Sequence, residues 1–130
     1  MVDHKNITVL YVDDEKDNLF VFKANFNRKF EVITSISAME ALDELEEHHN
    51  QIIVVISDMR MPVMNGLEFI KIAKARYSKI FYCILTGYGY DDDIQQALSD
   101  NLILKCFTKP FDAREIEDTI LLAAASRLQG

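Results

Sequence analysis

The stretch of sequence that decides the fold is residues 52–66, IIVVISDMRMPVMNG. It opens with residues 52–56, which are all β-branched and apolar. A short run of this kind predicts a strand buried on both faces, as the strands of parallel sheets are. Asp58 follows the run, and Asn65 with Gly66 predicts a turn into a helix. The stretch therefore predicts a buried strand that carries a carboxylate at its carboxyl end.

Four further segments have the character of strands, and amphipathic segments separate them. The stronger two are residues 7–12 (ITVLYV) and 80–85 (IFYCIL), and the weaker two are residues 31–34 (EVIT) and 103–107 (ILKCF). Apolar residues recur at three- and four-residue steps between the strands, which predicts helices. The expected helices follow the caps Asp17 or Asn18, span residues 38–48, 67–76 and 92–100, and follow the cap Asp112.

The alternation of strands and helices predicts the fold class. Crossover helices connect parallel strands, so we expect an α/β protein with a doubly wound, five-stranded parallel sheet and five helices. The length of 130 residues suits a single domain, which we expect to fill residues 1–130. In open sheets of this type, ligands bind outside the carboxyl ends of the strands.

Composition and charge exclude several classes of protein. Hydrophobic residues make up 49% and charged residues 27%, which is typical of globular domains, and four Gly with two Pro exclude collagen-like or low-complexity chains. The net charge of −7 argues against nucleic-acid binding. No apolar run approaches the ~18 residues of a membrane span. Cys83 and Cys106 lack CxxC spacing and fit reduced thiols, so we expect a cytoplasmic protein.

Polar residues stand at four of the predicted strand ends. Asp13 and Asp14 follow the first strand, Asp58 the third, Thr86 the fourth and Lys109 the fifth. Carboxylates ~4 Å apart repel by about 4 kcal/mol at an effective dielectric constant near 20, so the group should recruit a divalent cation. An all-oxygen ligand set favours Mg²⁺. Such a site can accept a phosphoryl group.

In that chemistry, Lys109 and Thr86 would neutralise and bind the phosphoryl oxygens. A carboxylate can serve as the nucleophile and form an acyl phosphate. We expect Asp58 to have this role, because it stands alone on the central strand between the acidic pair and Lys109.

Four segments resemble the signature segments of response-regulator receiver domains, the chemotaxis-regulator-like family of two-component signalling. They are YVDDE (11–15), SDMRMPVMNG (57–66), ILTGY (84–88) and FTKPF (107–111). The resemblance implies a flavodoxin-like sheet in the order 2-1-3-4-5, a cis Lys109–Pro110 peptide and Asp58 as the phosphoacceptor. It also implies a Mg²⁺ site formed by Asp13, Asp14, Asp58 and the backbone carbonyl of Arg60, with Thr86 and Lys109 contacting the phosphoryl group.

The resemblance further implies partners. A sensor histidine kinase or a phosphotransfer protein would donate the phosphoryl group, and a downstream effector domain or protein would respond. A homodimer through the fourth helix, fifth strand and fifth helix is a further expectation. Two further positions bear on how the family pattern applies to this chain. Cys106 stands where an aromatic residue is usual, with Phe107 expected on the opposite face, and Tyr88 is expected to shield the acyl phosphate from water.

Two other classes of protein remain alternatives. A haloacid-dehalogenase-like phosphatase also uses an Asp nucleophile with Mg²⁺, but needs a second Asp two residues later as general acid and base. Arg60 occupies that position and cannot take a proton from water, so we expect no turnover of an external substrate. The other alternative is a binding module that works without phosphorylation. The full set of Asp, Thr and Lys side chains argues against it.

Overall fold

The structure is a computed structural model that describes residues 4–87, 89 and 91–129. Strands and helices alternate along the described chain, as the apolar pattern predicts. The strands are β1 (Thr8–Val12), β2 (Glu31–Ser35), β3 (Ile52–Asp58), β4 (Phe81–Thr86) and β5 (Lys105–Thr108). The helices are α1 (Lys16–Phe26), α2 (Ala38–His48), α3 (Gly66–Arg76), α4 (Asp92–Ser99) and α5 (Ala113–Gln129).

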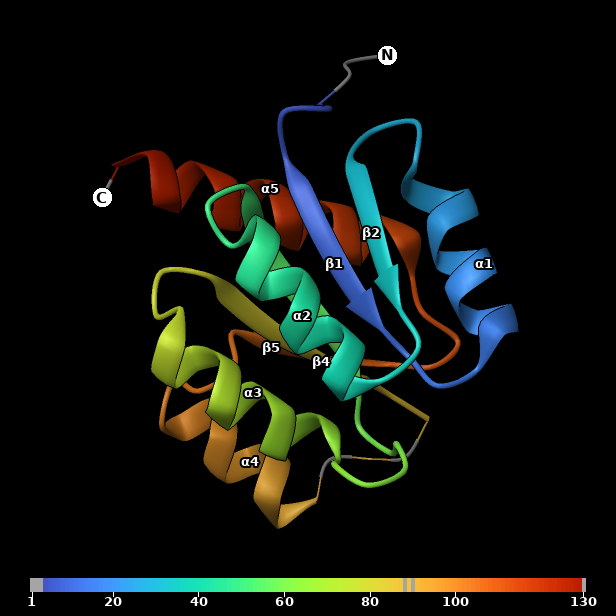
Figure 1. Cartoon of the computed structure of the whole chain (residues 1–130), viewed down its shortest axis with the longest axis vertical. Coiled ribbons are helices and arrows are strands. Elements are labelled where there is room, and N and C mark those ends of the chain that lie inside the picture. Colours follow the sequence, from blue (N-terminus) through green and yellow to red (C-terminus); the bar gives the residue numbers. More distant parts are fainter. Residues whose placement is uncertain (1–3, 88, 90, 130) are drawn as a thin grey trace.

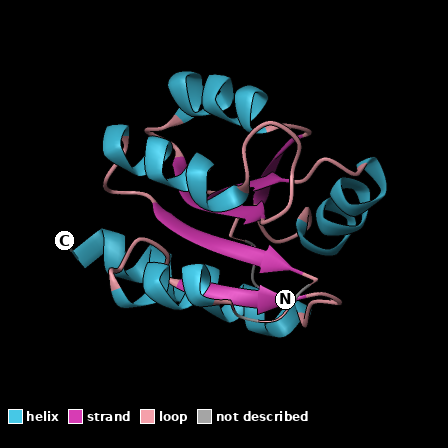
Figure 2. Cartoon of the chain, turned by 90° about the horizontal axis from the view of Figure 1, so that it is seen from below, coloured by secondary structure: helices cyan, strands magenta, loops and turns pink. Residues whose placement is uncertain are grey.

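The five strands form one parallel sheet in the order β2-β1-β3-β4-β5. This confirms the predicted fold class and strand order. β3 lies at the centre of the sheet, and Figure 2 shows the strands between two layers of helices. Because all strands run the same way, their carboxyl ends meet at one edge of the sheet. The polar residues that follow the strands are therefore brought to a common edge.

The helices cover the two faces of the sheet, and each face has its own hydrophobic core. In Figure 1, α5 passes behind β1 and β2, whereas α2 and α3 lie on the side of the sheet that faces the viewer. The core under α1 and α5 contains the buried aromatic residues Tyr11, Phe22, Phe26, Phe30 and Phe107. The core under α2, α3 and α4 is mainly aliphatic. Because strand residues alternate between faces, the neighbours Cys106 and Phe107 enter different cores, as expected.

Side-chain caps fix the start of most helices. Ser37 accepts a hydrogen bond from the backbone of Glu40, and Asp91 from that of Ile94. The predicted cap Asp112 is confirmed, since its carboxylate accepts the N–H of Arg114 at 2.9 Å. Each cap satisfies a backbone donor that the first helical turn leaves without a partner.

Two sequence predictions about element boundaries are wrong. The residue before α1 is Glu15, which makes no side-chain cap, and neither Asp17 nor Asn18 caps the helix. Asn18 instead turns its amide toward Asp13. The fifth strand begins at Lys105 rather than at residue 103, because the N–H of Ile103 bonds to the carbonyl of Ala97 at the end of α4 and not to the sheet. Among the described residues, no helix is long and apolar enough to cross a bilayer.

Candidate functional site

The structure brings the predicted polar residues to the carboxyl edge of the sheet. Asp13 follows β1, Asp58 is the last residue of β3, and Thr86 is the last residue of β4. All three are buried, and Asp13 is entirely without solvent exposure. Lys109 follows β5, and its backbone N–H donates to the carbonyl of Thr86 at 2.8 Å. The peptide bond between Lys109 and Pro110 is cis, as the resemblance implies.

Three carboxylates and one ammonium group form the centre of this site. Oxygens of Asp13, Asp14 and Asp58 lie within 4.8 Å of one another. The Nζ atom of Lys109 lies 3.1 Å from Oδ2 of Asp13 and 3.4 Å from Oδ1 of Asp58. The site thus holds three carboxylates but one ammonium group, which pairs with two of them. A divalent cation would neutralise the excess of negative charge.

Burial and the neighbouring charges shift the ionisation of this group. Burial raises the pKa of Asp58 above its ordinary value, and the charge of Asp13 raises it further, while Lys109 and the N–H of Met59 oppose the shift. Burial acts to lower the pKa of Lys109, but the hydrogen bond and charge of Asp13, together with Asp58, raise it above its ordinary value. Lys109 is thus held as a cation, and a second positive charge would favour the ionised form of Asp58.

The start of α3 fixes the backbone around Asp58. Asn65 and Glu68 form a reciprocal capping box, in which each side chain accepts the other's backbone N–H at 2.9 Å. A Cβ atom on Gly66 would lie 2.3 Å from the carbonyl oxygen of Asp58, and the N–H of Gly66 donates to the carbonyl of Met59 at 2.8 Å. Only glycine allows α3 to begin this close to the end of β3.

Asp13 has more hydrogen-bond partners than the sequence predicts. Its Oδ2 accepts from the hydroxyl of Tyr11 at 2.7 Å, from Asn18 at 3.1 Å and from Lys109 at 3.1 Å. Its Oδ1 accepts from the backbone N–H of Glu15 at 3.0 Å. The strand period of two could have indicated Tyr11, because residues 11 and 13 share a face. Asn18 carries no such signal, since its amide also suits a helix cap.

Asp14 differs from Asp13 in exposure and in contacts. It is half-buried, and no hydrogen bond from another described residue reaches its carboxylate. Its oxygens are therefore available to an ion. The donor set fits Mg²⁺, because it consists of carboxylate oxygens and contains no His or Cys. Arg60 lies two residues beyond Asp58 in the segment between β3 and α3, and Tyr88 lies outside the described residues.

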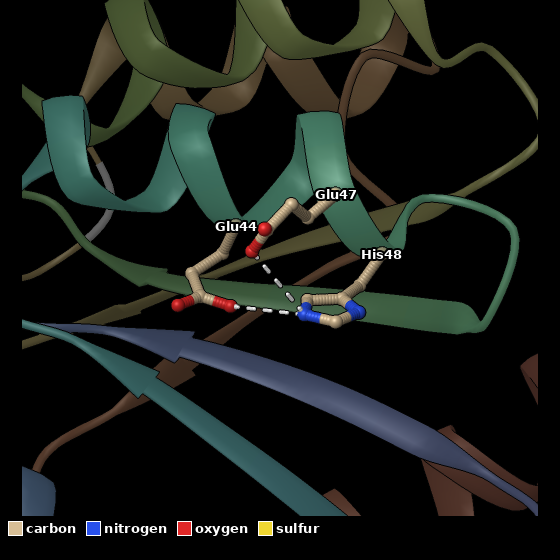
Figure 3. Close-up of side chains that lie close together, drawn as sticks. All are labelled: Glu44, Glu47 and His48. Carbon is tan, nitrogen blue, oxygen red and sulfur yellow. Dashed lines mark ion pairs between the residues drawn. The ribbon is translucent and has the colours of Figure 1, made fainter.

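A second group of potential metal ligands lies on α2, away from this edge. Glu44, Glu47 and His48 approach one another near the last turn of the helix (Figure 3). The Nε2 atom of His48 lies 3.8 Å from Glu44 and 3.6 Å from Glu47. All three side chains are at least partly exposed and come from the same end of one helix, and Glu44 stands four residues before His48. Their closeness thus follows from their places on one helix.

Comparisons with known proteins identify the family. The family model described as "Response regulator receiver domain" matches residues 9–121. Sporulation initiation phosphotransferase F of Bacillus subtilis (strain 168) is 30% identical over 116 residues, which cover 88% of this chain and 91% of that protein. The crystal structure of a response regulator receiver domain protein from Clostridium thermocellum has a TM-score of 0.88 at 29% identity, covering 95% of this chain and 99% of that one.

The chain is thus of the class that receives phosphoryl groups in two-component signalling. It belongs to the response regulator receiver domain family. The hydrogenase transcriptional regulatory protein HoxA of Cupriavidus necator is also similar, at 32% identity over 127 residues. These residues cover 97% of this chain but only 26% of HoxA, so this chain corresponds to about a quarter of that protein's length.

Proposed function

We propose that this receiver domain, residues 1–130, accepts a phosphoryl group on Asp58 and acts as a Mg²⁺-dependent switch in a phosphorelay. The observation that carries the proposal is the position of the Asp58 carboxylate. It lies 3.4 Å from the ammonium group of Lys109 and within 4.8 Å of oxygens of Asp13 and Asp14. A nucleophile, a cation and the ligands for a metal ion are thereby gathered at one edge of the sheet.

In the proposed reaction, an oxygen of ionised Asp58 attacks the phosphorus of a phosphohistidine. The new P–O bond forms as the P–N bond breaks, and the electron pair of that bond stays on the imidazole nitrogen of the donor. Lys109 neutralises charge on the phosphoryl oxygens, and the Thr86 hydroxyl donates a hydrogen bond to one of them. Mg²⁺, held by Asp13, Asp14, Asp58 and the carbonyl of Arg60, would supply charge neutralisation and orientation.

The phosphodonor we propose is a histidine kinase or a phosphotransfer protein. A hollow of about 530 Å³ lies beside the site, and the residues that line it include Lys109, Val21, Pro110 and Phe111. The neighbouring side chains on α1 are apolar and accessible, since Phe20 is 74% exposed and Val21 is 47% exposed. A partner that seats on this part of α1 would reach Asp58, because Lys109 belongs to both the hollow and the site.

The acyl phosphate would be a signal and not an intermediate of continuous turnover. The residue two positions after Asp58 is Arg60, which cannot act as a general base toward water. A downstream effector would then detect the phosphorylated edge of the sheet. We also propose a cytoplasmic location, which two buried cysteines present as thiols suit. A homodimer through α4, β5 and α5 stays a prediction.

Phosphorylation of the purified chain tests the proposal. With acetyl phosphate and Mg²⁺, intact-mass measurement should show the addition of one phosphoryl group, and peptide mapping should assign it to Asp58. Asp58→Asn should abolish the addition, and so should removal of Mg²⁺ with a chelator. The matched control is Asp43→Asn, which changes an exposed carboxylate on α2 and should be phosphorylated like the wild type.

A phosphoryl group that maps to another residue, or that persists in Asp58→Asn, would overturn the proposal. Retention of full phosphorylation after chelation would overturn its metal dependence. A phosphohydrolase would give a different result from a switch. It would release phosphate rapidly from acetyl phosphate, with many molecules of phosphate released per molecule of protein.

A further inference from the structure

We propose that Tyr11 is a positioning residue that holds the Asp13 carboxylate in a single orientation and thereby favours Mg²⁺ over Ca²⁺ at the site. Asn18 assists it. The role rests on the proposed function, because it concerns the ion bound by Asp13, Asp14 and Asp58. It adds that Tyr11, which contacts the ligand Asp13 and not the ion, helps to determine which ion is bound.

The first step is the number of donors around Asp13. A carboxylate has about four lone-pair positions, two on each oxygen. Oδ2 already accepts from Tyr11, Asn18 and Lys109, and so has no lone pair left for an ion. Oδ1 accepts only from the N–H of Glu15. Asp13 can therefore present one oxygen, and not two, toward an ion or a water molecule bound to it.

The second step is the rigidity of the donor. The Tyr11 ring is 1% exposed and stacks on Phe22, with ring centroids 4.1 Å apart and planes 11° from parallel. Phe22 in turn contacts Phe26 at 4.7 Å between centroids. The hydroxyl of Tyr11 thus has a fixed position. If the carboxylate turned away, a buried hydroxyl would lose its hydrogen-bond partner, which is unfavourable.

The third step is the difference between the two ions. Mg²⁺ requires near-octahedral geometry with ligands at about 2.0–2.1 Å, whereas Ca²⁺ accepts six to eight ligands at about 2.3–2.6 Å and commonly takes both oxygens of a carboxylate. Asp13 is denied this bidentate mode by the donors on Oδ2. Asp13 consequently offers a single oxygen, and a single oxygen suits the smaller ion.

The experiment compares ion selectivity in two Tyr→Phe variants of the full chain. Tyr11→Phe removes the hydroxyl that holds Asp13. Tyr82→Phe is the matched control, because Tyr82 is also 1% exposed and its hydroxyl donates to the backbone carbonyl of Tyr77 at 2.9 Å, in the other core. Titration calorimetry with Mg²⁺ and with Ca²⁺ gives the two dissociation constants for each variant and for the wild type.

In Tyr11→Phe the ratio of the Ca²⁺ to the Mg²⁺ dissociation constant should fall by about tenfold, corresponding to about 1.4 kcal/mol. Asn18→Ala, at a half-buried position, should shift the ratio in the same direction by less. Tyr82→Phe should leave it within about twofold of the wild type. A general loss of stability would not produce this pattern, because it would act on the binding of both ions alike.

Two results would overturn the inference. One is a ratio unchanged in Tyr11→Phe, whatever Asn18→Ala does, and the other is an equal change in Tyr82→Phe. Failure of the proposed function is distinguishable from these results, because it appears in the wild type. A wild-type chain that binds neither ion would overturn the metal site itself, and this inference with it.

Discussion

The two faces of the sheet contribute differently to the site. The α1 and α5 face is rich in buried aromatic rings, and its stacked pair Tyr11 and Phe22 supports Asp13. The α2, α3 and α4 face reaches the site through the backbone, where Gly66 packs against the carbonyl of Asp58. The core of that face also holds Cys106 of β5, which pairs with Ile84 of β4, two residues before Thr86. Cys106 is smaller than the aromatic residues of the opposite core. Buried rings thus fix Asp13, the proposed metal ligand, and the start of a helix fixes Asp58, the proposed phosphoacceptor.

The largest expected effect comes from the aromatic stack. Phe22→Ala should lower the free energy of unfolding by about 3–5 kcal/mol, because it leaves a cavity among buried rings. It should also weaken Mg²⁺ binding, since the ring of Tyr11 loses its support. Denaturant unfolding and ion titration measure the two effects.

The control on the opposite face is Phe69→Ala. Phe69 is fully buried in the core under α2, α3 and α4. A comparable loss of stability is expected, with Mg²⁺ affinity nearly unchanged in the folded protein. Equal weakening of Mg²⁺ binding in both variants would remove the distinction between the faces.

The two cysteines compare the faces by chemical reactivity. Burial raises the pKa of Cys83, under α1 and α5, to about 12, and that of Cys106, on the other face, to about 11. A raised pKa keeps a thiol neutral, and the thiolate is the reactive form. At pH 8, iodoacetamide should therefore modify either thiol at least about a hundredfold more slowly than an unperturbed thiol of pKa ≈ 8.5.

The rate of modification should rise as the pH increases toward the pKa of each thiol, and Cys106 should react before Cys83. Mass spectrometry of alkylated peptides follows each cysteine separately. The denatured chain is the control and should react at the ordinary rate. Rapid modification of either thiol in the native protein at pH 8 would contradict its burial.

Much of the site could be predicted because it depends on short-range pattern. The β-branched run before Asp58 marks a buried strand, and parallel strands bring their carboxyl ends together whatever the details of packing. The signals for Asp13, Asp14 and Lys109 are therefore local, and the structure brings these residues together as predicted. The prediction that Phe107 and Cys106 face opposite sides follows from the same alternation.

Other features could not be predicted because one polar group could bond to either of two hydrogen-bond partners, or because they depend on how a helix approaches the sheet. Asn18 suits a helix cap and also a hydrogen bond to Asp13, and only the folded position of α1 decides between them. Ile103 has strand character, but the end of α4 takes its N–H. The contact between Gly66 and the carbonyl of Asp58 depends on the approach of α3 to β3, which the Asn-Gly pair does not encode.

Cys106 offers a way to make the two faces more alike. Cys106→Phe inserts a large ring into a core where the thiol is 3% exposed, beside Ile84 in the neighbouring strand. Overpacking of this kind should lower the free energy of unfolding by about 1–3 kcal/mol. Thermal and denaturant unfolding measure the loss. Cys106→Ala adds neither volume nor a polar group and is the control. A fully stable Cys106→Phe would show that this core has unfilled space.

The smallest expected effect concerns the helix start that supports Asp58. Asn65→Ala removes the hydrogen bond that the Asn65 side chain accepts from the backbone N–H of Glu68. This loss should lower the free energy of unfolding by about 1 kcal/mol. Ser37→Ala removes the cap of α2 on the same face and should have a similar effect on stability. Only Asn65→Ala should also slow phosphorylation by acetyl phosphate, because only α3 begins against the backbone of Asp58. If both variants were phosphorylated at the wild-type rate, the contact at Gly66 would serve packing alone, and the phosphoacceptor would depend on the Asp13 side of the sheet for its position.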